Sequence, residues 1–259
     1  MQTKYPIILA HGIMIKDYRF FKAFGRIEKV LRNAGYSVYS SRTDGFGTVE
    51  NNAEQLKAQI REILAKENVD KINVIAHSKG GLDSRYMIEK LDMASSVASL
   101  TTLCTPHKGS ALAARIFSMP KWMAKMTAFW INFWYKIFGD KNPDALEVCR
   151  QLQSTEFDLF EINAPCDGVY SQSYSATLKR SRDDFVMGVP LQITKRCETS
   201  LSDGIVSVES AKYGEYKGDC LDESLSHSEI IDFMVKKKKR EKIYAFYLGL
   251  CSDLAERGY

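Results

Sequence analysis

The fold of this chain is decided by the stretch INVIAHSKGG, residues 72–81. Its first residues, Ile72 to Ala76, form a short, mostly apolar run, which is typical of a strand buried on both faces of a parallel sheet. The apolar spacing from Gly80 to Leu91 then predicts a helix. Ser78 is therefore expected on a sharp turn from strand to helix.

This turn matches the G-x-S-x-G nucleophile-elbow pattern, with Ala76 in the first glycine position. The elbow holds its serine in a strained backbone with Oγ above the sheet, so residues 76 and 80 must be small. Gly81 would let the helix pack close to the strand. The alternative is a glycine-rich turn with a surface serine, but the position between a buried strand and a helix favours Ser78 as a nucleophile.

Strands and helices alternate through the first half of the chain. Strands are predicted at residues 7–10, 36–40, 72–76 and 97–104, and helices at 20–34, 51–68 and 80–91. This alternation predicts an α/β protein with a mostly parallel central sheet flanked by helices. Residues 111–162 look helical, strands are predicted again at 169–177 and 191–197, and a helix at 229–254. We expect a single domain, 1–259, with a helical insertion at about 111–162.

A serine nucleophile needs a base, and the chain has four histidines. His77 is next to Ser78 and should point the wrong way, while His11 and His107 lie in other short motifs. His227, just before the last predicted helix, remains as the candidate, with a helix-capping role as the alternative.

The base needs an acid that fixes its tautomer and stabilises the imidazolium. Asp203 lies at a predicted turn after a strand, and Asp219 and Asp222 are its nearest rivals. The order Ser78, Asp203, His227 is that of α/β-hydrolases. An oxyanion hole would use the backbone N–H groups of Lys79 and Ile13, the second in the loop after the first strand.

Composition indicates an ordinary globular protein. The net charge of +4 is small and partly comes from the run Lys236 to Arg240, so nucleic acid is not expected as a partner. That run would go round a helix and is interpreted as a solvated surface, with anionic lipid or nucleic acid as the alternative. The six cysteines show no C-x-x-C spacing and read as mostly free thiols. With no visible signal peptide, we expect a cytoplasmic protein or one secreted without such a peptide.

These motifs resemble those of bacterial triacylglycerol lipases of the Pseudomonas, Burkholderia and Proteus type. The matching segments are residues 3–12, 76–81, 82–86, 101–110 and 202–206, together with His227. The resemblance implies the α/β-hydrolase fold and a serine carboxylic ester hydrolase that cleaves acylglycerol esters through an acyl-enzyme. A short-chain or aromatic-acyl esterase, an acyltransferase and a non-catalytic binding protein are the alternatives. The intact set of Ser78, Asp203 and His227 argues against the last.

The resemblance also bears on metal ions. No cofactor is needed for the chemistry, but many of these lipases hold a structural calcium through two aspartates. The matching positions are Asp183 or Asp184, and Glu229. The last is a glutamate, and because calcium takes several oxygen ligands, two carboxylates do not prove a site. A structural calcium at these positions is kept as a candidate.

A lid over the active site is the final implication. The segment from Ala111 to Asp140 contains all three tryptophans of the chain, and we expect its aromatic residues to face substrate or a lipid surface: Trp122, Phe129, Trp130, Phe133 and Trp134. Ordinary packing against the core is the alternative. The apolar stretch from Met126 to Tyr135 is too short to span a bilayer, which takes about 18 to 20 residues. The expected partner is therefore a lipid or small ester, with transient contact to a lipid interface.

Overall fold

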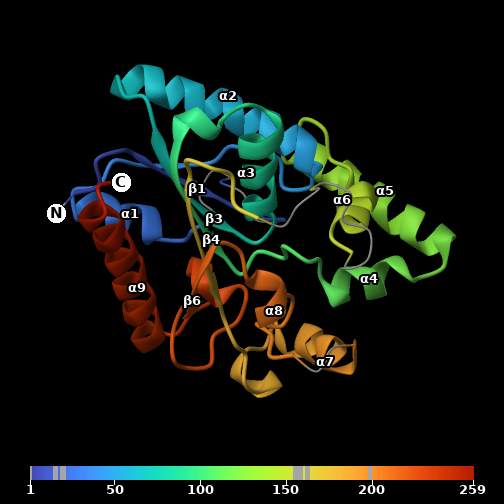
Figure 1. Ribbon diagram of the computed structural model, residues 1–259. Coiled ribbons are helices and arrows are strands. Elements are labelled where there is room, and N and C mark those ends of the chain that lie inside the picture. Colours follow the sequence, from blue (N-terminus) through green and yellow to red (C-terminus); the bar gives the residue numbers. More distant parts are fainter. Residues whose placement is uncertain (1, 14–16, 18–21, 154–159, 161–163, 198–199) are drawn as a thin grey trace.

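The computed structural model describes residues 2–13, 17, 22–153, 160, 164–197 and 200–259. A six-stranded sheet runs through its centre in the order β2-β1-β3-β4-β5-β6, and every pair of neighbouring strands is parallel. Helices cover both faces of this sheet (Figure 1). The predicted fold class, a mostly parallel sheet flanked by helices, is confirmed.

The strands of the sheet are short. Their bounds are β1 Ile7–Ala10, β2 Val38–Ser40, β3 Ile72–His77, β4 Val97–Leu103, β5 Tyr170–Ser175 and β6 Glu215–Asp219. Alternate side chains of a strand point to opposite faces. In β1, Ile7 and Leu9 join the core on one face, whereas Ile8 and Ala10 join the core on the other. Strand β1 is apolar on both faces because each face is covered, whereas the inner strand β5 (YSQSYS) buries polar side chains.

Four helices supply most of the cover. One core places α1 (Ile27–Asn33) and α9 (Lys237–Glu256) against the sheet, and the other places α2 (Val49–Glu67) and α3 (Lys79–Lys90) against it. Helix α3 begins immediately after β3, as the predicted elbow requires. The predicted start of a helix at Phe20 lies outside the described residues, and the described helix begins at Ile27.

The described part of the long connection between β4 and β5 contains three helices. They are α4 (Ala111–Phe117), α5 (Lys121–Ile137) and α6 (Ala145–Gln151). They lie to the right of the sheet in Figure 1, with α5 at the outside of the molecule. The predicted end of the helical segment near Ile162 lies mostly outside the described residues. No helix in the described part of the chain is both long and apolar enough to cross a bilayer.

The prediction of a strand at 191–197 is wrong, because this segment belongs to helix α7 (Gly188–Cys197). Its buried side chains Leu191 and Thr194 are three residues apart, which is helical spacing. The Thr194 hydroxyl also donates to the carbonyl of Pro190, one turn back. Pro190 is tolerated because it lies in the first turn, where its missing N–H costs nothing.

Two further features differ from the prediction. Strand β6 was not predicted, because an edge strand with the sequence EYKGD has no apolar run. The last helix starts at Lys237 rather than at Glu229. Glu229–Ile231 forms a 3-10 turn that ends at Asp232 in the left-handed region (φ 61°), and a short helix, α8 (Val208–Ala211), precedes β6.

Gly80 offers a test of the packing at the elbow. A Cβ at this position would lie 2.5 Å from the backbone oxygens of Ala10 and His11, which cannot move without shifting β1. We therefore expect Gly80→Ala to lower the free energy of unfolding by about 1 to 3 kcal/mol. The control is Gly249→Ala in α9, where the new methyl meets no atom within 4 Å, and which should raise it by about 0.5 to 1 kcal/mol. Urea denaturation measures both, and equal effects would contradict the packing argument.

Candidate active site

Ser78 lies between β3 and α3 with an unusual backbone. Its φ of 55° and ψ of −132° fall where a residue with a side chain is strained. Glycines allow close packing at this turn. A Cβ on Gly12 would lie 2.6 Å from the Cβ of Ser78, and one on Gly81 would lie 2.1 Å from Oγ1 of Thr105. The turn can therefore form only where the neighbouring residues lack side chains.

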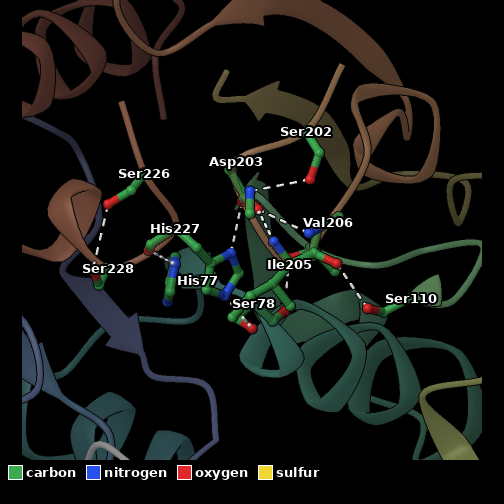
Figure 2. A network of polar contacts seen from close by, with 12 residues as sticks. His77, Ser78, Ser110, Ser202, Asp203, Ile205, Val206, Ser226, His227 and Ser228 are labelled. Carbon is green, nitrogen blue, oxygen red and sulfur yellow. Dashed lines mark hydrogen bonds and ion pairs between the residues drawn. The ribbon is translucent and has the colours of Figure 1, made fainter. Parts of the chain in front are cut away.

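The structure brings Ser78, His227 and Asp203 together, although they are far apart in the sequence (Figure 2). Nε2 of His227 lies 2.9 Å from Oγ of Ser78, and Nδ1 lies 2.6 Å from Oδ2 of Asp203. All three residues are buried. With the proton on Nδ1, the imidazole donates to the carboxylate and leaves Nε2 free to accept the serine proton.

The Asp203 carboxylate is fixed in place by its own turn. Its second oxygen, Oδ1, accepts hydrogen bonds from the backbone N–H groups of Ile205 (2.9 Å) and Val206 (2.8 Å). These bonds hold the carboxylate so that Oδ2 faces His227. Ser110 Oγ donates to the carbonyl of Ile205 at 2.7 Å and ties this turn to the start of α4. The two rival aspartates lie elsewhere: Asp219 accepts from the Ser175 hydroxyl, and the Asp222 carbonyl lies near the Lys179 ammonium.

The main chain of His227 is held from two sides. Its N–H donates to the carbonyl of Asp203 at 3.0 Å, and its own carbonyl accepts from Nε2 of His77 at 3.0 Å. The two imidazole rings lie 4.5 Å apart. His77 thus contacts the backbone of His227 instead of the Ser78 hydroxyl. Burial, and then the nearby His227, hold the pKa of His77 well below 6.5, so this ring is neutral.

The two predicted oxyanion donors belong to segments that adjoin Ser78 in the chain or in space. Lys79 is the first residue of α3, where a backbone N–H has no acceptor within the helix. Ile13 follows Gly12, which lies against Ser78. The Lys79 side chain is directed away into a buried ion pair with Asp83 at 2.6 Å, and burial raises the pKa of Asp83 to about 6. Only the backbone of Lys79 is therefore available to the site.

The remaining two histidines have structural partners. Nε2 of His11 lies 3.2 Å from Oγ1 of Thr43, and Nε2 of His107 lies 3.1 Å from Oγ1 of Thr102. His107 also stacks on Tyr213. Burial, followed by the nearby Arg85, holds the pKa of His107 well below 6.5.

The carboxylates that the resemblance assigns to calcium do not form a cation site. Asp184 accepts from the hydroxyl of Ser226, and Asp183 accepts from Ser224 at 2.8 Å. Both oxygens of Glu229 lie 2.7 Å from the Lys239 ammonium. Within the described residues, the three carboxylates form no cluster that could hold a metal ion. The Lys239 ammonium lies beside Glu229 where a calcium ion would have to bind, so these residues do not fit calcium.

A different group of ligand atoms does converge at the site. Single atoms of Cys104, Asp203 and His227 lie within 4.8 Å of one another. The hydrogen bond with Cys220, together with burial, raises the pKa of the Cys104 thiol well above its usual value. The thiol is therefore protonated and a poor metal ligand. The three predicted catalytic groups are side chains of this chain, and the hydrogen bonds that join them involve no cofactor.

The five aromatic residues assigned to a lid lie on α5 and are exposed. Trp122, Phe129, Trp130, Phe133 and Trp134 are between 46% and 66% exposed. Ordinary packing against the core therefore does not describe them. The helix is attached through its other side, where Tyr135 packs against Phe46.

The chain matches known proteins both in sequence and in structure. The model of the palmitoyl protein thioesterase family matches residues 6–153, more than half of the chain. The chain belongs to this family. Members are serine hydrolases, and the matched segment contains Ser78 but ends before Asp203 and His227. The family and the fold identify the chain as a carboxylic ester hydrolase, as the sequence predicted.

Named relatives of this thioesterase-family chain are lipases. It is 28% identical over 256 residues to triacylglycerol lipase 2 of Saccharomyces cerevisiae, covering 90% of this chain and 73% of the yeast protein. It is 30% identical to the triacylglycerol lipase of Burkholderia plantarii over 64% of this chain and half of that protein. The predicted resemblance to bacterial lipases is confirmed. Lipase 1 from Pelosinus fermentans shares the fold, with a TM-score of 0.68 at 15% identity over 98% of this chain and 99% of that one.

The sequence analysis missed the residues that support His227. His77, Ser226 and Lys239 all contact the His227 segment from other parts of the chain or from its flanks. A pairwise contact between distant segments leaves no periodic pattern. The one local signal was S-x-x-E at residues 226–229, which is a capping-box pattern.

The neutral, buried His77 predicts a pH dependence of stability. Its pKa is lowered on folding, so the unfolded chain takes up a proton below about pH 6.5 that the folded chain does not. Its contribution to the free energy of unfolding is therefore intact above pH 6.5 and declines at lower pH, at about 1.4 kcal/mol per pH unit. His77→Gln keeps a donor to His227 but removes this titration. Urea unfolding at pH 6 and pH 5 should show a shallower decline in the variant, with Asp83 and His107 titrating in both proteins. Parallel declines would contradict a neutral His77.

Proposed function

We propose that this protein hydrolyses acylglycerol esters through an acyl-enzyme intermediate, with Ser78 as nucleophile, His227 as base and Asp203 as acid. The observation that supports the proposal most directly is the relay from Oγ of Ser78 to Nε2 of His227 and from Nδ1 to Asp203. Each donor has an acceptor at hydrogen-bond distance, and the carboxylate is itself held by two backbone N–H groups.

The proposed reaction has two halves. His227 takes the proton of Ser78 as Oγ attacks the ester carbonyl, and the imidazolium is stabilised by Asp203. The backbone N–H groups of Lys79 and Ile13 stabilise the negative charge on the carbonyl oxygen. His227 then gives its proton to the leaving alcohol. A water molecule, activated by the same imidazole, releases the acid and restores Ser78.

The names of the relatives support a long acyl chain as the substrate. Two relatives are named for triacylglycerol and the family is named for a palmitoyl thioester. Both names describe an acyl group on an uncharged carbonyl, and the palmitoyl group of the family name is a long apolar chain. The family model makes hydrolysis of a long-chain thioester the second candidate. A short-chain or aromatic-acyl esterase and an acyltransferase remain alternatives with the same site.

The acyl-enzyme proposal is tested with a series of p-nitrophenyl esters from acetate to palmitate and with palmitoyl-coenzyme A as a thioester. Ser78→Ala should lower kcat on every substrate by about 10⁴-fold or more, because the nucleophile is absent. Activity of the wild type should be greatest on the longer esters. Full activity of Ser78→Ala would contradict the proposal, and a preference for the thioester over the palmitate ester would favour the second candidate. Added alcohol acceptors detect acyl transfer.

We also propose that α5 contacts a lipid interface as part of a lid at about 111–162. Its exposed aromatic residues form a continuous row of ring contacts from Phe129 to Phe138. Residues 111–139 contain no acidic side chain, and Lys121, Lys125 and Lys136 accompany the aromatic residues on α5. An amphipathic helix with aromatic and cationic side chains is suited to a lipid surface that carries negative charge.

Substitution of the exposed aromatic residues should weaken binding to a lipid surface and leave the hydrolysis of a dissolved ester nearly unchanged. The triple substitution of Trp130, Phe133 and Trp134 by serine should weaken binding to vesicles of phosphatidylcholine and phosphatidylglycerol by about tenfold or more. Hydrolysis of a dissolved short ester should change little, because these side chains do not contact Ser78. Met234→Ser, an exposed apolar residue just before α9, is the control. Unchanged vesicle binding of the triple variant in sedimentation assays would refute an interfacial role for α5.

The cysteines support the expectation of a reducing compartment. Cys104, Cys149, Cys166, Cys220 and Cys251 are free thiols. Free thiols persist where glutathione and thioredoxin keep them reduced.

A further inference from the structure

The segment that follows His227 is held by the first turn of α9. The Lys239 ammonium lies 2.7 Å from each oxygen of Glu229, and Nε of Arg240 lies 2.6 Å from Oδ1 of Asp232. Glu229 is only 7% exposed at its side chain and Asp232 only 2%. Two cations of the run Lys236 to Arg240 thus neutralise two buried carboxylates, and the interpretation of the whole run as a solvated surface is wrong for Lys239 and Arg240.

Glu229 frames His227 through a capping box. Oε2 of Glu229 accepts from the N–H of Ser226 at 3.1 Å, while the N–H of Glu229 donates to Oγ of Ser226 at 3.2 Å. This reciprocal pair encloses His227 and Ser228. The contacts between Ser226 and Ser228 are drawn in Figure 2. The position of the Glu229 carboxylate therefore fixes the backbone that carries the imidazole.

The placement of the cations argues against a passive surface role. Positive charges in the first turn of a helix oppose its dipole and are unfavourable there. Lys236, Lys237 and Lys238 are exposed, but Lys239 has a side chain only 18% exposed and directed onto Glu229. The ion pair with Glu229 offsets this unfavourable interaction for Lys239, and Glu229 belongs to the segment that carries His227.

We propose that Lys239 is a positioning residue for His227: its ammonium, acting on Glu229, is the fixed cation that holds the catalytic histidine segment in place of a bound metal ion. This inference rests on the proposed function of Ser78 and His227. It follows from the disagreement with a calcium site, because the carboxylate next to the histidine already has a cation that belongs to the chain.

The first test replaces the cation and keeps the alkyl chain. Lys239→Met should lower kcat on a soluble p-nitrophenyl ester by about 10- to 100-fold with KM nearly unchanged, because a displaced base slows the chemical step. Lys238→Met, which removes the same charge from an exposed neighbour, should keep wild-type kcat. Lys239→Arg should restore most of the activity. A wild-type kcat for Lys239→Met, with or without a lower Tm, would overturn the proposal.

A second variant covers the case in which Lys239→Met does not fold. Glu229→Gln keeps the capping box, because glutamine can fill the same position, but removes the charge that Lys239 holds. It should lower kcat, and adding Lys239→Met to it should lower kcat little further. Independent, multiplying losses would show that the two residues do not act as a pair.

The metal arm of the experiment uses the wild type with millimolar EDTA and with added CaCl₂. Neither should change kcat if Lys239 supplies the cation. Loss of activity in EDTA and its recovery with calcium would overturn the proposal. Ser78→Ala distinguishes failure of the proposed function from failure of the proposed role of Lys239. If Ser78→Ala stays active, the proposed function is wrong. If it is inactive while Lys239→Met matches the wild type, only the role of Lys239 fails.

Discussion

The backbone of Ser78 is the constraint on which the rest of the structure depends. A serine at φ 55° is strained, and it persists only because the surroundings leave no other conformation. Gly12 and Gly80 allow the first strand and helix α3 to approach within contact distance of the turn. The parallel sheet brings the carboxyl ends of β1, β3 and β4 to the same side of the molecule. Segments that are far apart in the sequence therefore meet at this serine.

Much of this arrangement could be predicted because the pattern that indicates each element lies within the element's own sequence. Strands β1, β3 and β4 are mostly apolar runs, so they were found almost to the residue. With only four histidines, elimination and chain order were enough to propose His227 and Asp203, which the structure places beside Ser78. The signal in each case is a short pattern whose physical cause lies within the same segment.

The features that escaped prediction depend on distant parts of the chain. Apolar and polar residues alternate from Leu191 to Cys197 much as in a strand. The segment is nevertheless a helix, and its buried side chains Leu191 and Thr194 are three residues apart. Strand β6 exists because β5 offers it an edge, and its own sequence is polar. The ion pair between Glu229 and Lys239 joins residues on either side of a break in the helical pattern, where Asp232 is left-handed. Neither partner alone indicates the other.

The same distinction separates the two tasks of the molecule. The chemistry lies on short, buried segments whose hydrogen bonds leave little freedom, from the Asp203 turn to the capping box around His227. The apolar face of α5 lies outside this network. The helix is attached along its opposite side, where Ala128 is buried with Phe46 and Ala145, and Oδ1 of Asn132 accepts from the N–H of Ala145. The lipid contact that we propose for the exposed aromatic row therefore depends on other contacts than the hydrogen bonds that hold His227 and Asp203.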